Sequence, residues 1–321
     1  MDKKDKEEFY SPPPKLGKGE QCMTFIWNPE TKEFMGRTAG SWAKILLFYL
    51  IFYIVLSVYW GGLWVAFKAI AINKETPRYM LKESLIGTNP GLGFRPMPAA
   101  EFVDSALIWY NQNNYGYLNW TTQLEKFLKP YYGDTSSRPE DRNPNVQNCT
   151  YETPTKNVPP NRVCRVPIEK FAPCHQQHYQ YDKGSPCIFL KLNRIFNWIP
   201  EYYNDSKILP EKMPNHLKLK IKNIEDRNRY EMNTVWVSCE GENAADREHI
   251  GPISMFPSPG FPGFYFPFSN AKGYLSPLVA VWFEKPTKGV LINVECKAWA
   301  KNIEYDRHDR RGSVHFELMI D

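Results

Sequence analysis

The sequence lacks the short motifs that mark the common classes of enzyme. Its 321 residues contain no Gly-rich phosphate loop, no His-Glu-x-x-His and no Gly-x-Ser-x-Gly. The sequence GLGF at 91–94 belongs to no strand–helix unit, so it predicts a turn rather than a nucleotide site. We therefore expect no catalytic residue, no cofactor and no nucleic-acid partner.

Histidine is scarce, with 6 residues in the whole chain. One grouping, Cys174 and His175 with His178 and Cys187, offers side chains that zinc accepts as ligands. Two histidines in a disulfide-bonded loop are the simpler interpretation, because domains outside the cell tend to have oxidised cysteines. The sequence therefore predicts no metal site.

Long uncharged runs are rare as well, and residues 45–67 form the one such run in the chain. A helix of this length reaches about 34 Å, and the hydrocarbon core of a bilayer is about 30 Å thick. A cleaved signal peptide has a shorter apolar region close to the start of the chain, whereas 44 residues precede this run. The run predicts a signal-anchor that separates residues 1–44 from residues 68–321. One span cannot by itself line an ion path.

Cysteine, rather than charge, predicts the orientation. Lysine and arginine favour neither side of the span, so the positive-inside rule does not decide. Six of the seven cysteines follow the span, which is typical of disulfides in an oxidising compartment. Three glycosylation sequons follow it too, at Asn119, Asn148 and Asn204. We predict a cytoplasmic tail at 1–44 and a glycosylated extracellular domain at 68–321.

The tail is polar and carries charges of both signs, so most of it is predicted to be disordered. The part nearest the span is richer in aromatic residues, among them Trp27, Phe34 and Trp42. These side chains could pack at the membrane surface or on a partner.

The outer domain has the periodicity of β-strands. Apolar and polar residues alternate at 217–223, 290–298 and 314–320, as they do in half-buried strands. Residues 278–283 are apolar throughout, as in a strand buried on both faces. We predict an antiparallel β-sandwich with a short inserted helix. The helix is expected where five residues share one helical face: Phe102, Val103, Ala106, Leu107 and Tyr110.

Spacing alone does not determine how the six outer cysteines pair. Local geometry favours sequential pairs. In two of them a turn-forming segment lies between the two cysteines, and in the third each cysteine lies in or at the end of a strand-like segment. The favoured pairs are Cys149–Cys164, Cys174–Cys187 and Cys239–Cys296.

Aromatic residues recur at helical spacing within the span. Phe48 and Phe52 are four apart, as are Tyr49 and Tyr53, and the two rows adjoin. A lipid-facing anchor needs no phenol hydroxyl, and a buried hydroxyl usually finds a partner. Small residues farther along allow another helix to approach closely. We therefore favour docking against a partner helix over a simple anchor, with Ser57 and Gly61 extending the contact.

Long segments of the chain resemble the Na,K-ATPase beta subunits. The likeness covers nearly all of the chain past residue 20 and is weakest at 85–165. The aromatic outer half of the span looks more like an invertebrate form. The segments that carry the resemblance are 25–53, 181–200, 256–268, 274–283 and 292–303.

This resemblance implies a single-pass type II glycoprotein of the plasma membrane with an immunoglobulin-like outer domain and three sequential disulfides. It implies a non-catalytic subunit, because the alpha subunit of the family binds ATP and transports sodium and potassium. The beta subunit helps alpha to mature and reach the plasma membrane, and it tunes potassium affinity and occlusion. A small single-span regulatory subunit often joins the complex.

The resemblance also implies roles for particular residues. The aromatic face of the span matches the face that packs against membrane helices of alpha in the family. An aromatic loop of the outer domain matches an element near the alpha contact. The residues concerned are Phe48, Tyr49, Phe52 and Tyr53 in the span and Phe264, Tyr265, Phe266 and Phe268 in the loop.

Three alternatives stay open at this point. An H,K-ATPase beta subunit would have the same fold and a different partner. A cell-adhesion glycoprotein would bind a copy of itself on an apposed cell through the outer domain. An ectoenzyme is disfavoured because the sequence offers no catalytic grouping.

Overall fold

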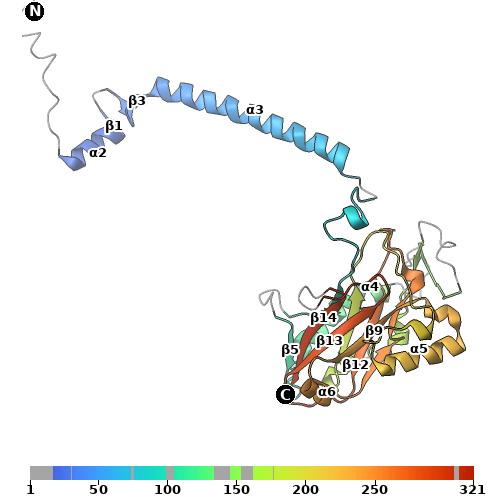
Figure 1. The fold of residues 1–321 in the computed structure, drawn as a ribbon. Helices are drawn as coiled ribbons and strands as arrows, with labels where there is room; N and C mark the ends of the chain where they lie inside the picture. Colours follow the sequence, from blue (N-terminus) through green and yellow to red (C-terminus); the bar gives the residue numbers. More distant parts are fainter. Residues whose placement is uncertain are drawn as a thin grey trace, which may run out of the picture. The chain divides into compact units, whose positions relative to one another are not determined.

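The computed structural model describes residues 17–29, 31–73, 76–98, 105–133, 145–152, 162–175, 177–306 and 311–321. The chain forms two compact units, Met1–Asn73 and Lys74–Asp321 (Figure 1). The first sixteen residues of the predicted disordered tail lie outside the described residues.

The first unit consists of a short helix, a small antiparallel sheet and one long helix. Helix α2 (Lys18–Ile26) precedes three two-residue strands, and helix α3 (Ala39–Ala71) follows them. Part of the segment before the span is therefore ordered, as its aromatic content suggested. The strands are β1 (Trp27–Asn28), β2 (Glu33–Phe34) and β3 (Arg37–Thr38).

Helix α3 is 33 residues long and extends past the predicted run at both ends. The flanking residues contain no proline, so nothing stops the helix at Lys44 or Lys68, where the uncharged part ends. Within the described residues, α3 is the one helix that is long and apolar enough to cross a membrane.

The second unit is a mainly-β domain built on two sheets. In neither sheet does the spatial order of the strands follow their order in the chain: the strand orders are β10-β12-β8-β4 and β11-β9-β13-β14-β5. All neighbours are antiparallel except β5, which pairs in parallel with β14 and so departs from the all-antiparallel prediction. The strands are β4 (Leu92–Arg95), β5 (Leu107–Tyr110), β8 (Cys187–Leu192), β9 (Thr234–Gly241), β10 (Ile253–Phe256), β11 (Gly260–Pro262), β12 (Leu278–Phe283), β13 (Ile292–Trp299) and β14 (Ser313–Ile320).

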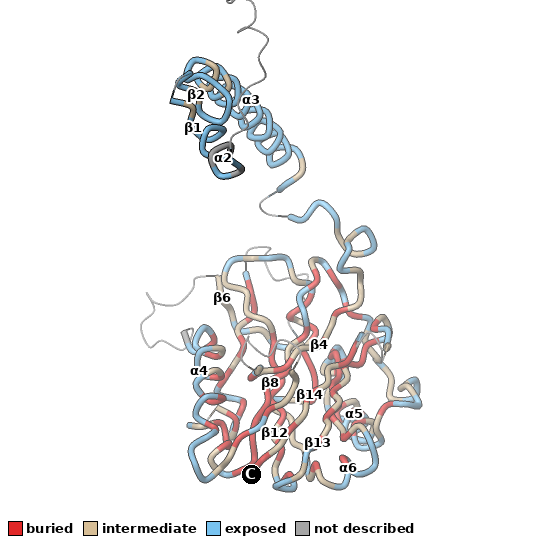
Figure 2. The backbone as a smooth tube through the Cα atoms, turned by 90° about the vertical axis from the view of Figure 1, so that its left-hand side faces the viewer, coloured by how far each residue is buried: buried red, intermediate tan, exposed pale blue. Residues whose placement is uncertain are grey.

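Three of the predicted strands are confirmed, two by alternating burial and one by burial on both faces, as the sequence indicates. Alternate residues of β13 and β14 are buried, and β12 is buried along most of its length. The ring of Phe316 in β14 lies 5.0 Å from that of Phe94 in β4 and 6.1 Å from that of Phe283 in β12, which joins the two sheets across one core. Figure 2 shows this buried core along the strands.

Helices pack around the sheets. They are α4 (Leu118–Gly133), α5 (Asn215–Arg227) and α6 (Ala244–His249). Shorter elements are β6 (Val146–Gln147), paired in parallel with β7 (Val163–Cys164), and 3-10 turns at Leu81–Glu83, Ile168–Phe171, Gln177–Lys183, Ser206–Ile208, Arg229–Met232 and Gly263–Tyr265.

The prediction of a strand at 217–223 is wrong, because these residues belong to α5. Leu217, Ile221 and Ile224 are spaced as on one face of a helix, and all three are buried against Trp236 and Trp299 of the five-stranded sheet. The period-two pattern also placed Leu219 inside, but that side chain is 64% exposed.

Two other local predictions are wrong. Residues 107–110 form β5 rather than the predicted helix, and Phe102 and Val103, which were to share its face, lie outside the described residues. Residues 92–95 form β4 rather than a turn, because pairing with β8 draws them into the four-stranded sheet.

Candidate functional site

Four aromatic residues near the start of α3 form a continuous tetrad. The rings of Phe48 and Phe52 stack at 6.3 Å, and those of Tyr49 and Tyr53 stack at 6.2 Å. Neighbouring rings of the two rows meet edge to face at 5.4 Å. The structure therefore brings together the four helix residues that the sequence grouped, on one face.

This tetrad has no cover within the described part of the chain. The four side chains are 47–63% exposed, and no described residue of α3 is buried. Farther along, a Cβ atom added at Gly61 or Gly62 would meet nothing within 4 Å. The helix therefore offers large rings on one part of its surface and open backbone on another, which suits close packing of a further helix.

Each end of α3 has an aromatic contact. The indole of Trp42 donates a hydrogen bond to the carbonyl of Phe34 in β2 at 2.8 Å, and the two rings lie 6.1 Å apart. Near the other end, the Lys68 ammonium lies 5.5 Å from the ring centroid of Trp64. These contacts place amphipathic indoles about where interfacial belts occur on membrane helices.

The aromatic loop of the second unit, Lys74–Asp321, points partly inward. Tyr265 and Phe266 are buried, whereas Phe264 and Phe268 are half-buried. Phe266 packs edge to face on Trp198 at 5.6 Å. Of the four loop residues that the sequence singled out, Phe264 and Phe268 thus keep surface for a partner, and the other two support the loop from within.

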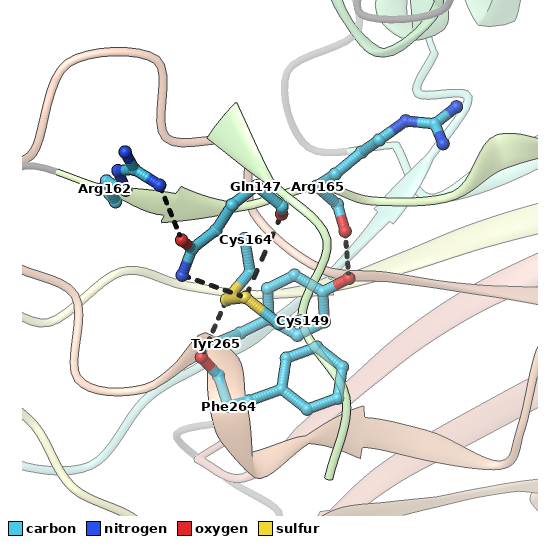
Figure 3. Close-up of a disulfide and its surroundings, with 7 residues drawn as sticks. All are labelled: Gln147, Cys149, Arg162, Cys164, Arg165, Phe264 and Tyr265. Carbon is cyan, nitrogen blue, oxygen red and sulfur yellow. Dashed lines mark hydrogen bonds between the residues drawn. A yellow bond between two sulfur atoms is a disulfide. The ribbon is translucent and has the colours of Figure 1, made fainter. Parts of the chain in front are cut away.

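A disulfide adjoins this loop (Figure 3). Cys149 and Cys164 are bonded, and the sulfur of Cys164 lies 3.4 Å from the carbonyl oxygen of Phe264. The hydroxyl of Tyr265 donates to the carbonyl of Arg165 at 2.8 Å, one residue past the disulfide. Burial raises the pKa of Tyr265, so the phenol stays a donor through the physiological range. The disulfide and this bond together fix the loop.

A half-open hollow of about 480 Å³ adjoins the same disulfide. Tyr151 and Phe264 form part of its wall, with their rings edge to face at 5.3 Å. Arg165 and Glu169 at its rim form a two-pronged ion pair of 3.0 and 3.1 Å. These two side chains neutralise each other, so neither leaves an unpaired charge in the hollow.

The other two disulfides join the remaining pairs that were favoured from the sequence, Cys174–Cys187 and Cys239–Cys296. Cys239 and Cys296 stand opposite each other in the register of β9 and β13. Because Cys174 and Cys187 are bonded, they offer no thiolate beside His175 and His178. Among the described residues, no cluster of three or more potential ligands could hold a metal ion.

The three sequon asparagines are exposed. Asn119 lies in the first turn of α4, and the hydroxyl of Thr121 in the same sequon is buried and donates to the carbonyl of Leu118. Asn148 lines the hollow beside Cys149, and Asn204 lies in an open loop.

Sequence reasoning missed one group of charged residues. Arg95, Lys191 and Arg194 gather where β4 meets the end of β8. The pairing of Lys191 with Gly93 depends on the strand register, which the sequence pattern did not reveal. The sole signal was the presence of two cations just after the apolar segment of β8.

Comparison with known proteins agrees with the resemblance. The sequence model described as sodium/potassium ATPase beta chain matches residues 14–316. Sodium/potassium-transporting ATPase subunit beta-2 of Drosophila melanogaster is 46% identical over 98% of this chain and 96% of its own length. Subunit beta-1 of the same organism is 40% identical over 98% of this chain and 97% of its own length. The mouse beta-2 subunit is 33% identical over 94% of each chain.

Proposed function

The chain belongs to the sodium/potassium ATPase beta chain family, and we propose that it acts as the non-catalytic partner of a P-type ATPase alpha subunit. In this role it stabilises alpha during maturation, accompanies it to the plasma membrane, and adjusts its potassium affinity and occlusion. The relatives reported above are all named as sodium/potassium-transporting, which favours that pump over the proton-transporting one.

The exposed tetrad on α3 is the observation that carries this proposal. Aromatic rings gain free energy by packing, and phenol hydroxyls in an apolar medium need acceptors. Phe48, Tyr49, Phe52 and Tyr53 contact one another and otherwise stay exposed within the described chain. Membrane helices of alpha would supply further packing for the rings and acceptors for the two hydroxyls, and Ser57 with Gly61 would continue the contact along the helix.

The proposed topology is type II. Residues 1–44 lie in the cytoplasm, residues 45–67 cross the membrane, and residues 68–321 form the outer domain. The three disulfides support this orientation, since such bonds persist in oxidising compartments and all follow the span. We assign the outer domain to the immunoglobulin-like sandwiches with unusual connections, which its two packed sheets support. Its glycans are placed on Asn119, Asn148 and Asn204.

A second contact with alpha is proposed for the outer aromatic loop. Phe264 and Phe268 are its half-buried members, which keep some surface for a partner, while Tyr265 and Phe266 hold the loop in shape. Membrane lipid covers the rest of α3. A small regulatory subunit and a copy of the chain on an apposed cell are further partners that the family likeness suggests.

The test is a mild-detergent pulldown of the full chain from its native membrane, with protein identification and an ouabain-sensitive ATPase assay. Recovery of an alpha subunit with sodium- and potassium-dependent activity is the expected result. Recovery of a proton pump would keep the fold and change the ion. If no ATPase co-purifies, the proposal fails and adhesion becomes the leading hypothesis.

A further inference from the structure

Two cationic side chains lie on one face of the four-stranded sheet, and a third lies near them just past the end of β8. Lys191 of β8 stands opposite Gly93 of β4, so Arg95, two residues further along β4, is its diagonal neighbour on the same face. Arg194 follows three residues after Lys191. Among the described residues, no carboxylate forms an ion pair with any of the three.

The electrostatics of this cluster favour an anion. Burial, followed by the charges of Arg95 and Arg194, lowers the pKa of Lys191. Burial lowers the pKa of Arg95 as well, against an opposing effect of Tyr131. Lys191 and Arg95 are half-buried and Arg194 is exposed, so their repulsion raises the free energy of the fold mainly at the first two, and an anion placed between the cations would offset that cost.

Aromatic rings hold both guanidinium groups in place. The guanidinium carbon of Arg95 lies 5.7 Å from the ring centroid of Phe127 in α4, and that of Arg194 lies 5.2 Å from the ring centroid of Phe268. Nη1 of Arg95 already donates to the carbonyl of Phe94 and to the sulfur of Met97, both at 2.7 Å, so the donors of Arg194 are the ones that a phosphate could accept in a pair. The cluster is therefore partly organised before an anion arrives.

An apolar hollow adjoins the cluster. It has a volume of about 280 Å³, and Arg194 and Phe268 form one side of it. The other side includes Tyr79, Leu81 and Ile86. Tyr79 is 64% exposed and Ile86 is 77% exposed, so this wall lacks a cover within the described chain.

We propose that the cluster and the hollow together bind one phospholipid, with its phosphate between Lys191 and Arg194 and its glycerol and acyl part against the apolar wall. A phospholipid presents an anion next to an apolar surface, whereas free phosphate would leave Tyr79 and Ile86 uncovered.

Lipid binding can be measured by native mass spectrometry of the full-length chain in detergent, titrated with phosphatidylcholine, with diacylglycerol and with inorganic phosphate. We expect a one-to-one adduct with phosphatidylcholine and none with diacylglycerol. The variant K191Q/R194Q should bind phosphatidylcholine at least about tenfold more weakly, because it loses charge-assisted hydrogen bonds. I86S should weaken the lipid adduct but leave phosphate binding unchanged.

Matched variants separate a specific site from general attraction of the chain to lipid. R194K keeps the charge but loses the paired guanidinium donors, so it should bind more weakly than the wild type and more tightly than K191Q/R194Q, whereas K170Q removes an exposed cation at the other hollow and should have no effect. Equal binding of the wild type and K191Q/R194Q, with an unchanged near-ultraviolet circular dichroism spectrum, would overturn the proposal. Phosphate binding as tight as lipid binding would overturn it too. The proposed lipid site is formed by this chain alone and does not need the alpha subunit. Recovery of alpha in the pulldown therefore tests the proposed function separately.

Discussion

Helix α3 and the outer domain both depend on aromatic contacts, but they satisfy them differently. In the outer domain, Phe94, Phe283 and Phe316 are buried and their rings touch across the two sheets. In the tetrad of α3 the rings touch only one another and stay exposed. The domain thus contains the partners of its own aromatic residues, whereas the helix must find them elsewhere. We expect the stability of the domain to be intrinsic and the packing of the helix to depend on a partner.

The largest effect is expected from the core of the outer domain. Phe316→Ala should lower the free energy of unfolding by about 3–5 kcal/mol, because the ring is fully buried between the sheets. Leu219→Ala, at an exposed position of α5, should change it by no more than about 0.5 kcal/mol. Denaturant unfolding of the full chain followed by tryptophan fluorescence checks both. A large cost at Leu219 would contradict its assignment to the exposed face.

The disulfide between β9 and β13 should come next. Replacing Cys239 and Cys296 together by serine should cost about 2–5 kcal/mol, since it releases the longest disulfide loop, with a sequence separation of 57 residues. Delivery to the cell surface should fall accordingly. Cys22→Ser is the matched control, because that thiol is free and exposed. Normal surface delivery of the double variant would contradict the prediction.

Alkaline pH should destabilise the outer domain through its buried tyrosines. Burial raises the pKa of Tyr274 to about 12, and it raises the pKa of Tyr110 as well. These folded-state values exceed the unfolded value of about 10, so their stabilisation is complete below pH 10 and is lost as pH rises through the folded values. Each such tyrosine should cost about 1.4 kcal/mol per pH unit above pH 10.

Tyr110→Phe tests this prediction directly. Its hydroxyl has no hydrogen-bond partner within the described residues, so stability at neutral pH should hardly change. The slope of stability against pH above pH 10 should become shallower. Phenolate absorbance and near-ultraviolet circular dichroism measure this slope. An unchanged slope would show that Tyr110 does not contribute to the loss of stability at alkaline pH.

Substitutions in α3 should have the smallest effect on the domain, and they test most directly whether the helix depends on a partner. Tyr49→Ala with Tyr53→Ala should weaken association with the partner by about 1–2 kcal/mol and leave the unfolding of the outer domain unchanged. Leu47→Ala with Ile54→Ala changes two positions that are not three or four residues from any of the four rings, and it serves as the control. Quantitative co-purification is the readout. Equal recovery of alpha with the two double variants would sink the assignment of the tetrad as the docking face.

Alternation along the sequence predicted strands correctly in two segments and wrongly in a third. The segments predicted at 290–298 and 314–320 form β13 and β14. The segment at 217–223 alternates as well, but its apolar residues also fit the i, i+4 spacing of a helix. Burial of Ile224, just beyond the alternating segment, decides for the helix. Tertiary packing supplied the information that local pattern lacked.

The candidate sites divide in the same way. The tetrad lies within one helix, so spacing along the chain was enough to find it. The cationic cluster joins β4 to the end of β8, almost a hundred residues apart, and exists because of strand register. The inward direction of Tyr265 and Phe266 likewise depends on contacts with Arg165 and Trp198, which are distant in sequence.

The parallel pairing of β5 with β14 also has a consequence for the order of synthesis. Leu107 lies opposite Glu317, so 317 − 107 = 210 residues must be made after one strand before its neighbour emerges. At about 5–20 residues per second, β5 waits about 10–40 seconds for that neighbour. During this interval its backbone donors and acceptors have no β14 to bind, and the core residue Ile108 has no completed sheet to cover it. We expect quality-control factors to engage the nascent domain during this interval.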